Sequence, residues 1–406
     1  MQNDSDPGFS ATDHAMMARA LRLAERGLFT TQPNPRVGCV IAHGGEVVGE
    51  GWHRQAGGPH AEVFALREAG LRARGATVYT TLEPCSHQGR TPPCADALLQ
   101  AGVARVVMAS GDPNPKVAGD GVRRLGTAGI AVETGLMCDA ARDLNRGFFA
   151  RFELGRPWVR IKLAMSLDGR TALANGESKW ITGEAARADV QRWRARSSAI
   201  LAGAGTARAD DPRLTVRLPA LEGNRGQSRF LRQIRGSGGE PAKNDSDPLS
   251  QAQPFRPLRV VLDARLDALA LHANLLDGSA PTLVLHAPGT RVRDDRHARV
   301  ELAEVPLDAH GRRLDLGAAL RLLAARGGNE LQVEAGPTLC GALFEQGLVD
   351  ELLVYTAPTL LGDAARPLLQ LPALASLADR RDWRSVDRRM FGPDQRLLLR
   401  PVDSGG

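Results

Sequence analysis

Apolar and polar residues alternate along the first third of the chain with two different spacings. Apolar positions recur at helical intervals over 15–26, which predicts an amphipathic helix, and a second helix is expected from Ala61 onward. Short apolar runs typical of buried strands lie between and after these helices, at 37–42, 46–50, 77–82 and 105–109. Helices and strands that alternate in this way predict α/β layers.

The same rhythm returns in the second half of the chain without any repeat of the sequence. A helix is expected over 184–196, and strands at 159–164, 199–202, 259–262, 282–285 and 331–334. The polar run 151–157 contains Gly155 and ends in Pro157, which is typical of a junction. Because 406 residues exceed the usual size of one core, we expect two domains, at 1–155 and 156–406.

One segment of the second half breaks this pattern. Between 219 and 257 the composition shifts to Gly, Ser, Gln, Asn, Asp and Pro, which cannot bury enough apolar surface to offset the entropy lost on ordering. We therefore expect a flexible surface insertion, whose deletion should change little in either half of the protein. The chain ends in a polar tail at 403–406.

The overall composition is that of a globular protein. Hydrophobic residues make up 43% and charged residues 24%, and neither an apolar run of membrane-spanning length nor a charged and apolar leader is found. Five cysteines are too few, and odd in number, for a secreted disulfide framework. We expect reduced thiols in a cytoplasmic protein, with metal ligands among them.

The chain is basic, with a net charge of +6 and a pI near 9.4. This charge indicates an anionic partner, and leaves open whether it is nucleic acid, a phosphorylated metabolite or a phosphate-bearing cofactor. Many of the arginines lie along the helix expected at 184–196, where a solvated helix face also explains them. An aromatic content of 4% provides little for the base stacking that single-strand binders use.

Four residues form a pattern suited to a catalytic zinc ion. His60 precedes the helix expected from Ala61, Glu62 follows it closely, and Cys85 and Cys94 lie further along. One imidazole and two thiolates leave a fourth tetrahedral position for water, which distinguishes a catalytic from a closed structural site. Zinc lowers the pKa of that water, and Glu62 is suited to move its proton to the ring nitrogen and the departing amine. The pattern predicts hydrolytic deamination of a nitrogen heterocycle with one zinc ion per chain.

The pattern departs from the usual signature in one respect. Zinc nucleobase deaminases have two residues between their cysteines, whereas residues 86–93 separate Cys85 from Cys94 here. A structural zinc site or unconnected thiols are the alternative interpretation. The other cysteines, Cys39, Cys138 and Cys340, are expected in the core. Two nearby histidines, His53 and His87, either bind substrate or lie on the surface.

The long segment between the two cysteines carries a resemblance to a known family. PCSHQGRTPPC at 84–94, together with PNPRVGCV at 33–40, resembles the bifunctional riboflavin-biosynthesis deaminase/reductase family. The resemblance covers nearly all of 13–400 outside the insertion, through GDPNP at 111–115, KLAMSLDGR at 162–170, SKWITG at 178–183, ADDPRLTVR at 209–217 and VEAGPTL at 333–339.

The resemblance implies two consecutive reactions, each with its own fold. A cytidine-deaminase-like N-terminal domain would deaminate a diaminopyrimidinone ribosylamino phosphate. An α/β domain of the dihydrofolate-reductase type would then reduce the ribosyl group of the product to a ribityl chain with NADPH. The absence of a Gly-x-Gly-x-x-Gly sequence between a strand and a helix accords with that second fold.

The resemblance also implies the residues of each site. We expect the deaminase substrate to contact Asn34, with His53 and His87. Lys162 and Asp210 are candidates for polarising or protonating the opened sugar. The expected cofactor contacts are Ala164, Trp180, Thr206, Asp210, Gly336, Pro337 and Thr338, and the expected substrate contacts are Ser178, Arg194, Leu214, Arg217 and Glu334.

The residues alone support part of this assignment. Arg194 and Arg217 are suited to bidentate phosphate binding. The glycine turns at 203–206 and 336–338 follow apolar strands and either approach phosphates or are simply tight turns.

Two other classes of protein stay open from the sequence. A tRNA-editing or nucleoside deaminase fused to an unrelated domain would share the zinc chemistry and the basic charge, and a binding module would use zinc for structure alone. The preferred interpretation is a homo-oligomeric enzyme that acts on a small phosphorylated pyrimidine, with neither nucleic acid nor a membrane as partner.

Overall fold

The structure, a computed structural model, describes residues 8–86, 92–217 and 255–402. The described residues form two compact units: the first contains 8–154 and Phe255, and the second contains 155–217 and 256–402. The predicted insertion lies outside the described residues except for 255–257, and so does the polar tail. None of the helices in the described ranges is long and apolar enough to cross a membrane.

The first unit is built on one sheet with the strand order β2-β1-β3-β4-β5. β1 runs antiparallel to both of its neighbours, whereas β3, β4 and β5 are parallel. The strands are β1 Gly38–His43, β2 Glu46–Trp52, β3 Thr77–Thr80, β4 Arg105–Met108 and β5 Ala131–Thr134. The helices are α1 Ala11–Glu25, α2 Ala61–Ala69, α3 Cys94–Ala101, α4 Asp120–Thr127, α5 Cys138–Leu144 and α6 Arg146–Glu153, with a 3-10 turn at Gly70–Ala73.

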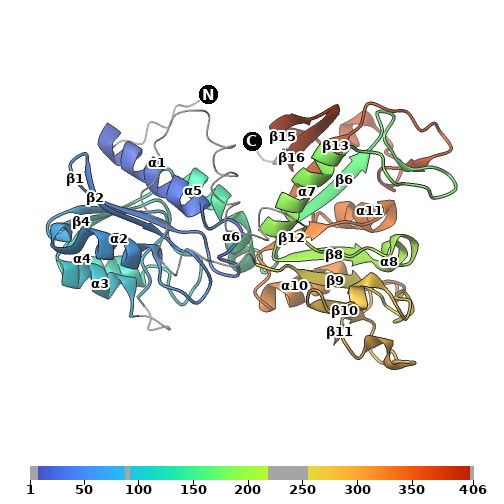
Figure 1. The fold of residues 1–406 in the computed structure, drawn as a ribbon, viewed down its shortest axis with the longest axis horizontal. Coiled ribbons are helices and arrows are strands. Elements are labelled where there is room, and N and C mark those ends of the chain that lie inside the picture. The colour runs from blue at the N-terminus through green and yellow to red at the C-terminus, as the bar shows by residue number, and fades with distance from the viewer. Residues whose placement is uncertain (1–7, 87–91, 218–254, 403–406) are drawn as a thin grey trace. The chain divides into compact units, whose positions relative to one another are not determined.

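Helices cover both faces of this sheet (Figure 1). Successive residues of a strand point to opposite faces, so Cys39 and Ile41 pack with α2, α3 and α4, whereas Val40 and Ala42 pack with α1 and α5. The unit therefore has three layers with a core on each side of the sheet.

The second unit is built on a larger sheet with the order β11-β10-β9-β8-β12-β6-β13-β16-β15. Neighbouring strands are parallel from β11 to β13, and β16 and β15 are antiparallel to their neighbours. The strands are β6 Trp158–Met165, β8 Ala199–Gly203, β9 Leu258–Leu262, β10 Thr282–His286, β11 Glu301–Glu304, β12 Glu330–Val333, β13 Glu351–Thr356, β15 Trp383–Phe391 and β16 Asp394–Pro401. A separate pair joins β7 Arg170–Ala172 to β14 Arg366–Pro367.

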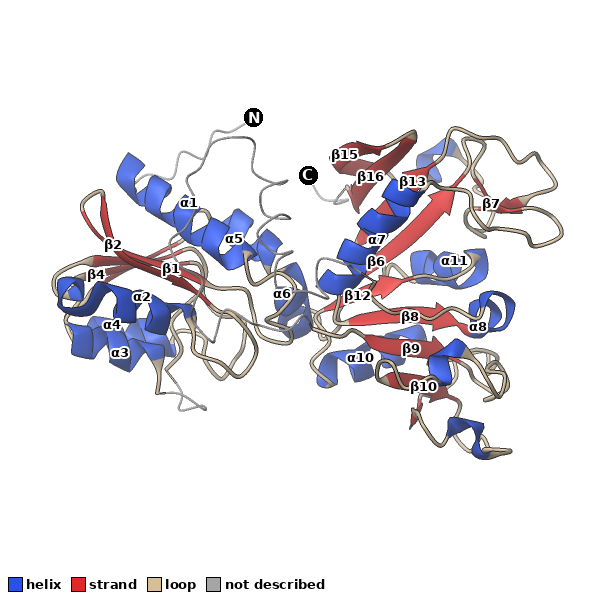
Figure 2. Cartoon of the chain, in the orientation of Figure 1, coloured by secondary structure: helices blue, strands red, loops and turns tan. Residues whose placement is uncertain are grey.

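Helices also pack on both faces of the larger sheet (Figure 2). Ile161 and Leu201 share a core with α10 and α11, whereas Ile200 packs with α8 on the opposite face, and Leu353 packs with α7. The helices are α7 Glu184–Arg196, α8 Ala204–Asp210, α10 Leu316–Ala325 and α11 Pro337–Glu345, with 3-10 turns at Asn274–Leu276, Asp295–His297 and Leu377–Asp379.

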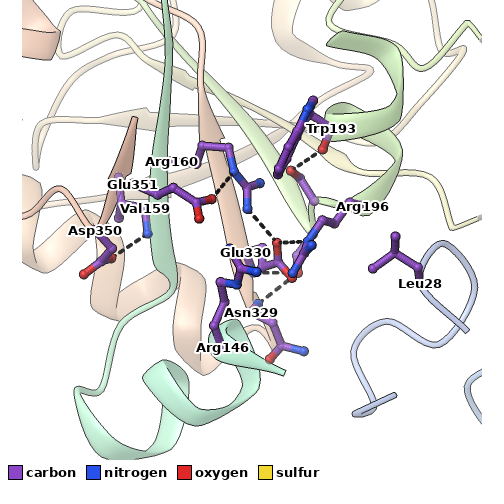
Figure 3. A network of polar contacts seen from close by, with 12 residues as sticks. Leu28, Arg146, Val159, Arg160, Trp193, Arg196, Asn329, Glu330, Asp350 and Glu351 are labelled. Atoms are coloured by element: carbon purple, nitrogen blue, oxygen red, sulfur yellow. Dashed lines mark hydrogen bonds and ion pairs between the residues drawn. The ribbon is translucent and has the colours of Figure 1, made fainter. Parts of the chain in front are cut away.

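A buried network of ion pairs joins the first residues of three central strands (Figure 3). Arg160 of β6 is fully buried and donates to Glu351 of β13 (2.6 Å) and to Glu330 of β12 (3.0 Å). Arg196, the last residue of α7, also donates to Glu330 (2.6 Å). Arg160 is paired with both carboxylates, so its loss would remove one partner from each of two buried charges, and breaking a buried ion pair typically costs about 3–5 kcal/mol. The network therefore holds the three strands and the end of α7 together.

The elements expected from the apolar spacing are confirmed. The helix expected at 184–196 is α7, and the ends of the expected strands shift by at most two residues. The structure also contains elements that the sequence analysis does not predict. α1 begins at Ala11 rather than at residue 15, and the strands β5, β7, β11, β13, β14, β15 and β16 were not expected. Two residues also differ from expectation. Arg151 begins the junction run but lies within α6, and Cys138 is half-buried rather than part of the core.

Candidate active sites

The three expected zinc ligands converge where two helices of the first unit begin. His60 immediately precedes α2, Cys94 is the first residue of α3, and Cys85 follows β3. The Nδ1 atom of His60 lies 3.5 Å from Cys85 Sγ and 3.3 Å from Cys94 Sγ. Across 8–86, 92–217 and 255–402, this is the one group of three His, Cys, Asp or Glu side chains whose ligand atoms all lie within 4.8 Å of one another.

The start of α3 also positions Cys85. The amide of Cys94 donates to Cys85 Sγ (3.4 Å), and the amide of Ala95 donates to the Cys85 carbonyl oxygen (3.1 Å). A helix leaves these first amides unpaired, and they favour negative charge.

The two thiols and the imidazole are suited to share a cation. The hydrogen-bonded Cys94 thiol, and then His60, hold the pKa of Cys85 well below its usual range, while Cys85 raises the pKa of Cys94. Thiols this close ionise together only beside a positive charge. One nitrogen and two sulfur donors form the ligand set of a catalytic zinc site, so the residues present fit this metal.

Glu62 lies beside this group in the first turn of α2. Its side chain is buried, with 3% of the residue exposed, and its Oε2 atom has no hydrogen-bond partner within the described part of the chain. Burial raises the pKa of Glu62, and the charge of His60 opposes this rise. A buried carboxylate oxygen of this kind needs a partner, and a water molecule held at the fourth position of the metal would be one.

His53 packs against His60, with the ring centroids 5.4 Å apart. Its Nδ1 atom lies 3.0 Å from the Pro59 carbonyl oxygen, and its Nε2 atom lies 3.1 Å from the side-chain Nδ2 atom of Asn34. Burial lowers the pKa of His53 to about 4, so its ring is neutral. His53 is only 2% exposed, so the surface interpretation is wrong for this residue, whereas His87 lies outside the described residues.

Glu83 was not singled out from the sequence, although it lies close to Cys85. Its buried carboxylate accepts hydrogen bonds from the amides of Gly119 (3.1 Å) and Gly121 (3.0 Å), at the start of α4. A Cβ atom on Gly121 would lie 2.2 Å from the Pro84 carbonyl oxygen, so the two segments are in close contact. The available signal was an acidic residue at the end of an apolar strand, directly before Pro84 and Cys85.

The second unit contains a cleft of about 1860 Å³ beyond the carboxyl ends of its parallel strands. After β8 the chain continues to β9 on one side of the sheet, whereas after β12 it continues to β13 on the other side. β8 and β12 are neighbours, so a topological switch point lies between them. Ligands of open α/β sheets bind at such points. Pockets for one ligand usually measure roughly 300–1000 Å³, so this cleft has room for a cofactor and a substrate together.

The cleft brings together the residues that the resemblance assigns to the second reaction. They come from β6, α7, α8, the start of α11 and the loops between them. All of them line the cleft: Lys162, Ala164, Ser178, Trp180, Arg194, Thr206, Asp210, Leu214, Arg217, Glu334, Gly336, Pro337 and Thr338.

Two features of the cleft fit a nicotinamide dinucleotide. An added Cβ atom on Gly336, which directly precedes α11, would meet nothing within 4 Å, so a ligand can approach this helix start closely. Trp180 exposes 68% of its surface on the cleft wall, and the guanidinium of Arg187 lies 4.7 Å from the centre of its ring. An exposed indole provides a flat apolar surface for a ring of the cofactor.

Arg194 and Glu334 form a bidentate ion pair inside the cleft. The Nε and Nη2 atoms of Arg194 donate to the two carboxylate oxygens at 2.7 and 2.6 Å, and its Nη1 atom donates to the Thr215 carbonyl oxygen at 2.9 Å. These bonds use three of the five N–H groups of the guanidinium, and Arg194 lines the cleft. Arg194 therefore positions Glu334 and keeps donors for a phosphate.

Positive charge gathers near this pair. Burial lowers the pKa of Lys162, an effect that Glu334 opposes and Arg194 reinforces. Partial loss of hydration on the cleft wall lowers the pKa of Arg217, and the neighbouring charges of Arg194 and Arg213 lower it further. Arg217 itself is an exposed side chain on the cleft wall, which suits a phosphate contact.

Two protein families match the two halves of the chain. The cytidine and deoxycytidylate deaminase zinc-binding region matches residues 10–110, and the RibD C-terminal domain matches residues 157–394. The zinc-binding deaminase region and the reductase domain fit zinc and a nicotinamide cofactor. The second match accounts for the half that a nucleic-acid deaminase would leave unexplained.

Curated relatives match over nearly their whole length. The riboflavin biosynthesis protein RibD of Escherichia coli is 48% identical over 95% of this chain and 99% of its own, and that of Haemophilus influenzae is 45% identical over 97% and 98%. Among solved structures, RibD of Acinetobacter baumannii has a TM-score of 0.82 at 42% identity, covering 97% of this chain and 99% of its own.

A deaminase/reductase from Thermotoga maritima has a TM-score of 0.78 at 28% identity, covering 96% of this chain and 99% of its own. These findings confirm the expected fold class, with an N-terminal cytidine-deaminase-like domain followed by an α/β reductase domain. The chain belongs to the RibD family, the bifunctional deaminases and reductases of riboflavin biosynthesis.

Proposed function

We propose that the first unit deaminates 2,5-diamino-6-(5-phosphoribosylamino)pyrimidin-4-one and that the second reduces the product with NADPH. The observation that carries the proposal is the convergence of His60, Cys85 and Cys94 beside the unpartnered carboxylate oxygen of Glu62. The Thermotoga maritima protein is described as a diaminohydroxyphosphoribosylaminopyrimidine deaminase and 5-amino-6-(5-phosphoribosylamino)uracil reductase, which supports these substrates.

In the first reaction, His60, Cys85 and Cys94 would hold one zinc ion, which supplies a water molecule of lowered pKa. Glu62 accepts a proton from the attacking water and delivers it to the ring nitrogen, and then moves the proton of the newly added hydroxyl to the leaving amine. Water thus provides the new carbonyl oxygen, and ammonia leaves.

The neutral ring of His53 and the amide of Asn34 are proposed to orient the pyrimidine. The contact from His53 Nδ1 to the Pro59 carbonyl oxygen fixes the ring, and its Nε2 atom lies at the Asn34 amide. His87 is assigned to the same role by resemblance alone.

In the second reaction, NADPH supplies a hydride to the sugar carbon bonded to the amino nitrogen. Lys162 and Asp210 are proposed to polarise or protonate the opened sugar, and Arg217 to bind the substrate phosphate. Ser178, Arg194, Leu214 and Glu334 would complete the substrate contacts. The proposed contacts of NADPH are Ala164, Trp180, Thr206, Asp210, Gly336, Pro337 and Thr338.

We also propose that the enzyme works in the cytoplasm as a homo-oligomer, on this small molecule rather than on nucleic acid or a membrane. Ligand thiols require a reducing compartment. β15 ends its sheet, and Val386 and Met390 on this strand are 38% and 60% exposed. An end strand with exposed apolar side chains is suited to pairing between copies.

Product analysis with and without NADPH tests both activities. The diaminopyrimidinone should give one product without NADPH and a second, reduced product with it. Removal of zinc with a chelator should abolish the first product and leave the reduction of supplied uracil intermediate intact. Turnover of tRNA without turnover of the pyrimidinone would contradict the proposal.

A further inference from the structure

Three charged side chains on the rim of the reductase cleft have no role in the reactions above. Arg208, Arg265 and Asp267 all line the cleft. Arg208 lies in the last turn of α8, which follows β8, and the other two follow β9, the neighbouring strand.

The order of strands places this group at one end of a bound dinucleotide. β9 and β6 are separated by β8 and β12, so Arg265 and Lys162 extend from strands about 14 Å apart. The helix start at Gly336 follows β12, which lies between them. A cofactor with its nicotinamide near Lys162 and its diphosphate near Gly336 would extend its adenosine toward β9.

Two guanidinium groups share one carboxylate in this group. Arg208 donates to Asp267 Oδ1, and the Nε atom of Arg265 lies 3.4 Å from Asp267 Oδ2. The side chains of Arg208 and Arg265 are 48% and 79% exposed, so donors of both stay open to a ligand. The trio carries a net positive charge, and both oxygens of its carboxylate face arginines.

The turn that carries Arg265 is fixed by hydrogen bonds. The carboxylate of the buried Asp263 accepts from the Ala268 amide (2.8 Å), and the Ala264 carbonyl oxygen accepts from the Thr290 hydroxyl (3.1 Å) and the Ala287 amide (3.1 Å). A fixed backbone limits the positions that the guanidinium of Arg265 can reach.

We propose that Arg208 and Arg265 bind the 2′-phosphate of NADPH and thereby select NADPH over NADH. The inference rests on the proposed NADPH-dependent reduction. NAD enzymes bind the ribose 2′-hydroxyl with a free carboxylate, whereas NADP enzymes place an arginine near the 2′-phosphate. Asp267 is paired with both arginines, so the group presents guanidinium donors rather than a free carboxylate, and two arginines can hold a phosphate by charge-assisted hydrogen bonds.

The test compares the dissociation constants of NADP⁺ and NAD⁺, measured by calorimetry on the full chain. The double variant Arg208→Ala/Arg265→Ala should bind NADP⁺ at least about tenfold more weakly and NAD⁺ with unchanged affinity, because only NADP⁺ loses charge-assisted hydrogen bonds. The same contrast is expected for ADP-ribose with and without a 2′-phosphate.

Arg326→Ala is the matched control. Arg326 follows the last residue of α10 and pairs with Glu301, the first residue of β11, and neither residue lines the cleft. This variant should bind both nucleotides as the unaltered enzyme does.

Each outcome separates the inference from the proposed function. If the unaltered enzyme prefers NADP⁺ and the double variant keeps this preference, Arg208 and Arg265 are not the selecting residues. An equal loss of NADP⁺ and NAD⁺ affinity would also overturn the inference. Equal binding of both nucleotides by the unaltered enzyme would contradict the NADPH-dependent reduction itself.

Discussion

At the scale of single residues, the ion pair between Arg194 and Glu334 sets the charge of Glu334 in the cleft. Glu334 accepts both hydrogen bonds of the arginine fork and a further one from the Gln332 amide (2.8 Å). Burial alone would raise the pKa of Glu334, but the charge and hydrogen bonds of Arg194 outweigh this effect and lower it to about 2. Glu334 therefore stays ionised in the cleft, where its charge opposes the lowering of the Lys162 pKa by burial.

This lowered pKa predicts a pH-dependent contribution to stability. Folding favours ionised Glu334, so its contribution is complete above the ordinary pKa of 4.5 and is lost as the pH falls toward 2. A shift of this size corresponds to about 3 kcal/mol. The free energy of unfolding of Glu334→Gln should thus fall less steeply between about pH 5 and pH 3 than that of the unaltered protein, as measured by urea denaturation.

Glu184→Gln, at the exposed start of the helix that carries Arg194, is the control for this comparison. Its pH profile should follow that of the unaltered protein. Parallel profiles for Glu334→Gln and the unaltered protein would show that the ion pair does not stabilise the fold.

At the scale of elements, burial on both faces explains several of the strands that the sequence predicts. β8, β9 and β10 are covered on both faces and appear in the sequence as short, nearly continuous apolar runs. β15 exposes most of its residues, so its apolar spacing carries no signal of a sheet. Exposure explains why β15 was missed, but not why the buried β13 and the partly buried β16 were not predicted either.

The sequence predicts those site residues whose chemical types and spacing by themselves indicate a reaction. His60, Glu62 and the two ligand cysteines have types and spacing that indicate zinc. Contacts between distant elements carry no such signal, as with Arg194, which lies 140 residues from Glu334. The Arg265–Asp267 pair was missed for a different reason, since charged residues in a turn usually have no function.

Helix α2 carries Glu62 and packs on β2 at very short range, which predicts a sensitive position. A Cβ atom on Gly51 would lie 2.5 Å from the Ala61 carbonyl oxygen and 2.8 Å from the Ala65 amide nitrogen. Gly51→Ala must displace the start of this helix, and with it His60. We expect a loss of about 1–3 kcal/mol in the free energy of unfolding, together with weaker zinc binding, measured by denaturation and by metal competition.

Gly45→Ala is the matched control, because a Cβ atom there would meet nothing within 4 Å. It lies in the turn between β1 and β2 and should retain both zinc and stability. Normal zinc affinity in Gly51→Ala would show that the helix start does not depend on this close contact.

At the scale of the whole molecule, each candidate site draws its described residues from one unit. The ligand group and Glu62 belong to the first unit, and every lining residue of the cleft belongs to the second. Neither set needs a residue of the other unit for its chemistry. The two reactions should therefore be separable within the intact chain.

Glu62→Gln tests this separation, because it removes the proton carrier and leaves His60, Cys85 and Cys94 in place. We expect ammonia release to fall by at least about 100-fold, with the zinc content unchanged. NADPH oxidation with supplied uracil intermediate should continue at the rate of the unaltered enzyme. Loss of zinc with the deaminase activity would assign Glu62 a structural role, and loss of both activities with zinc retained would show that the two sites depend on each other.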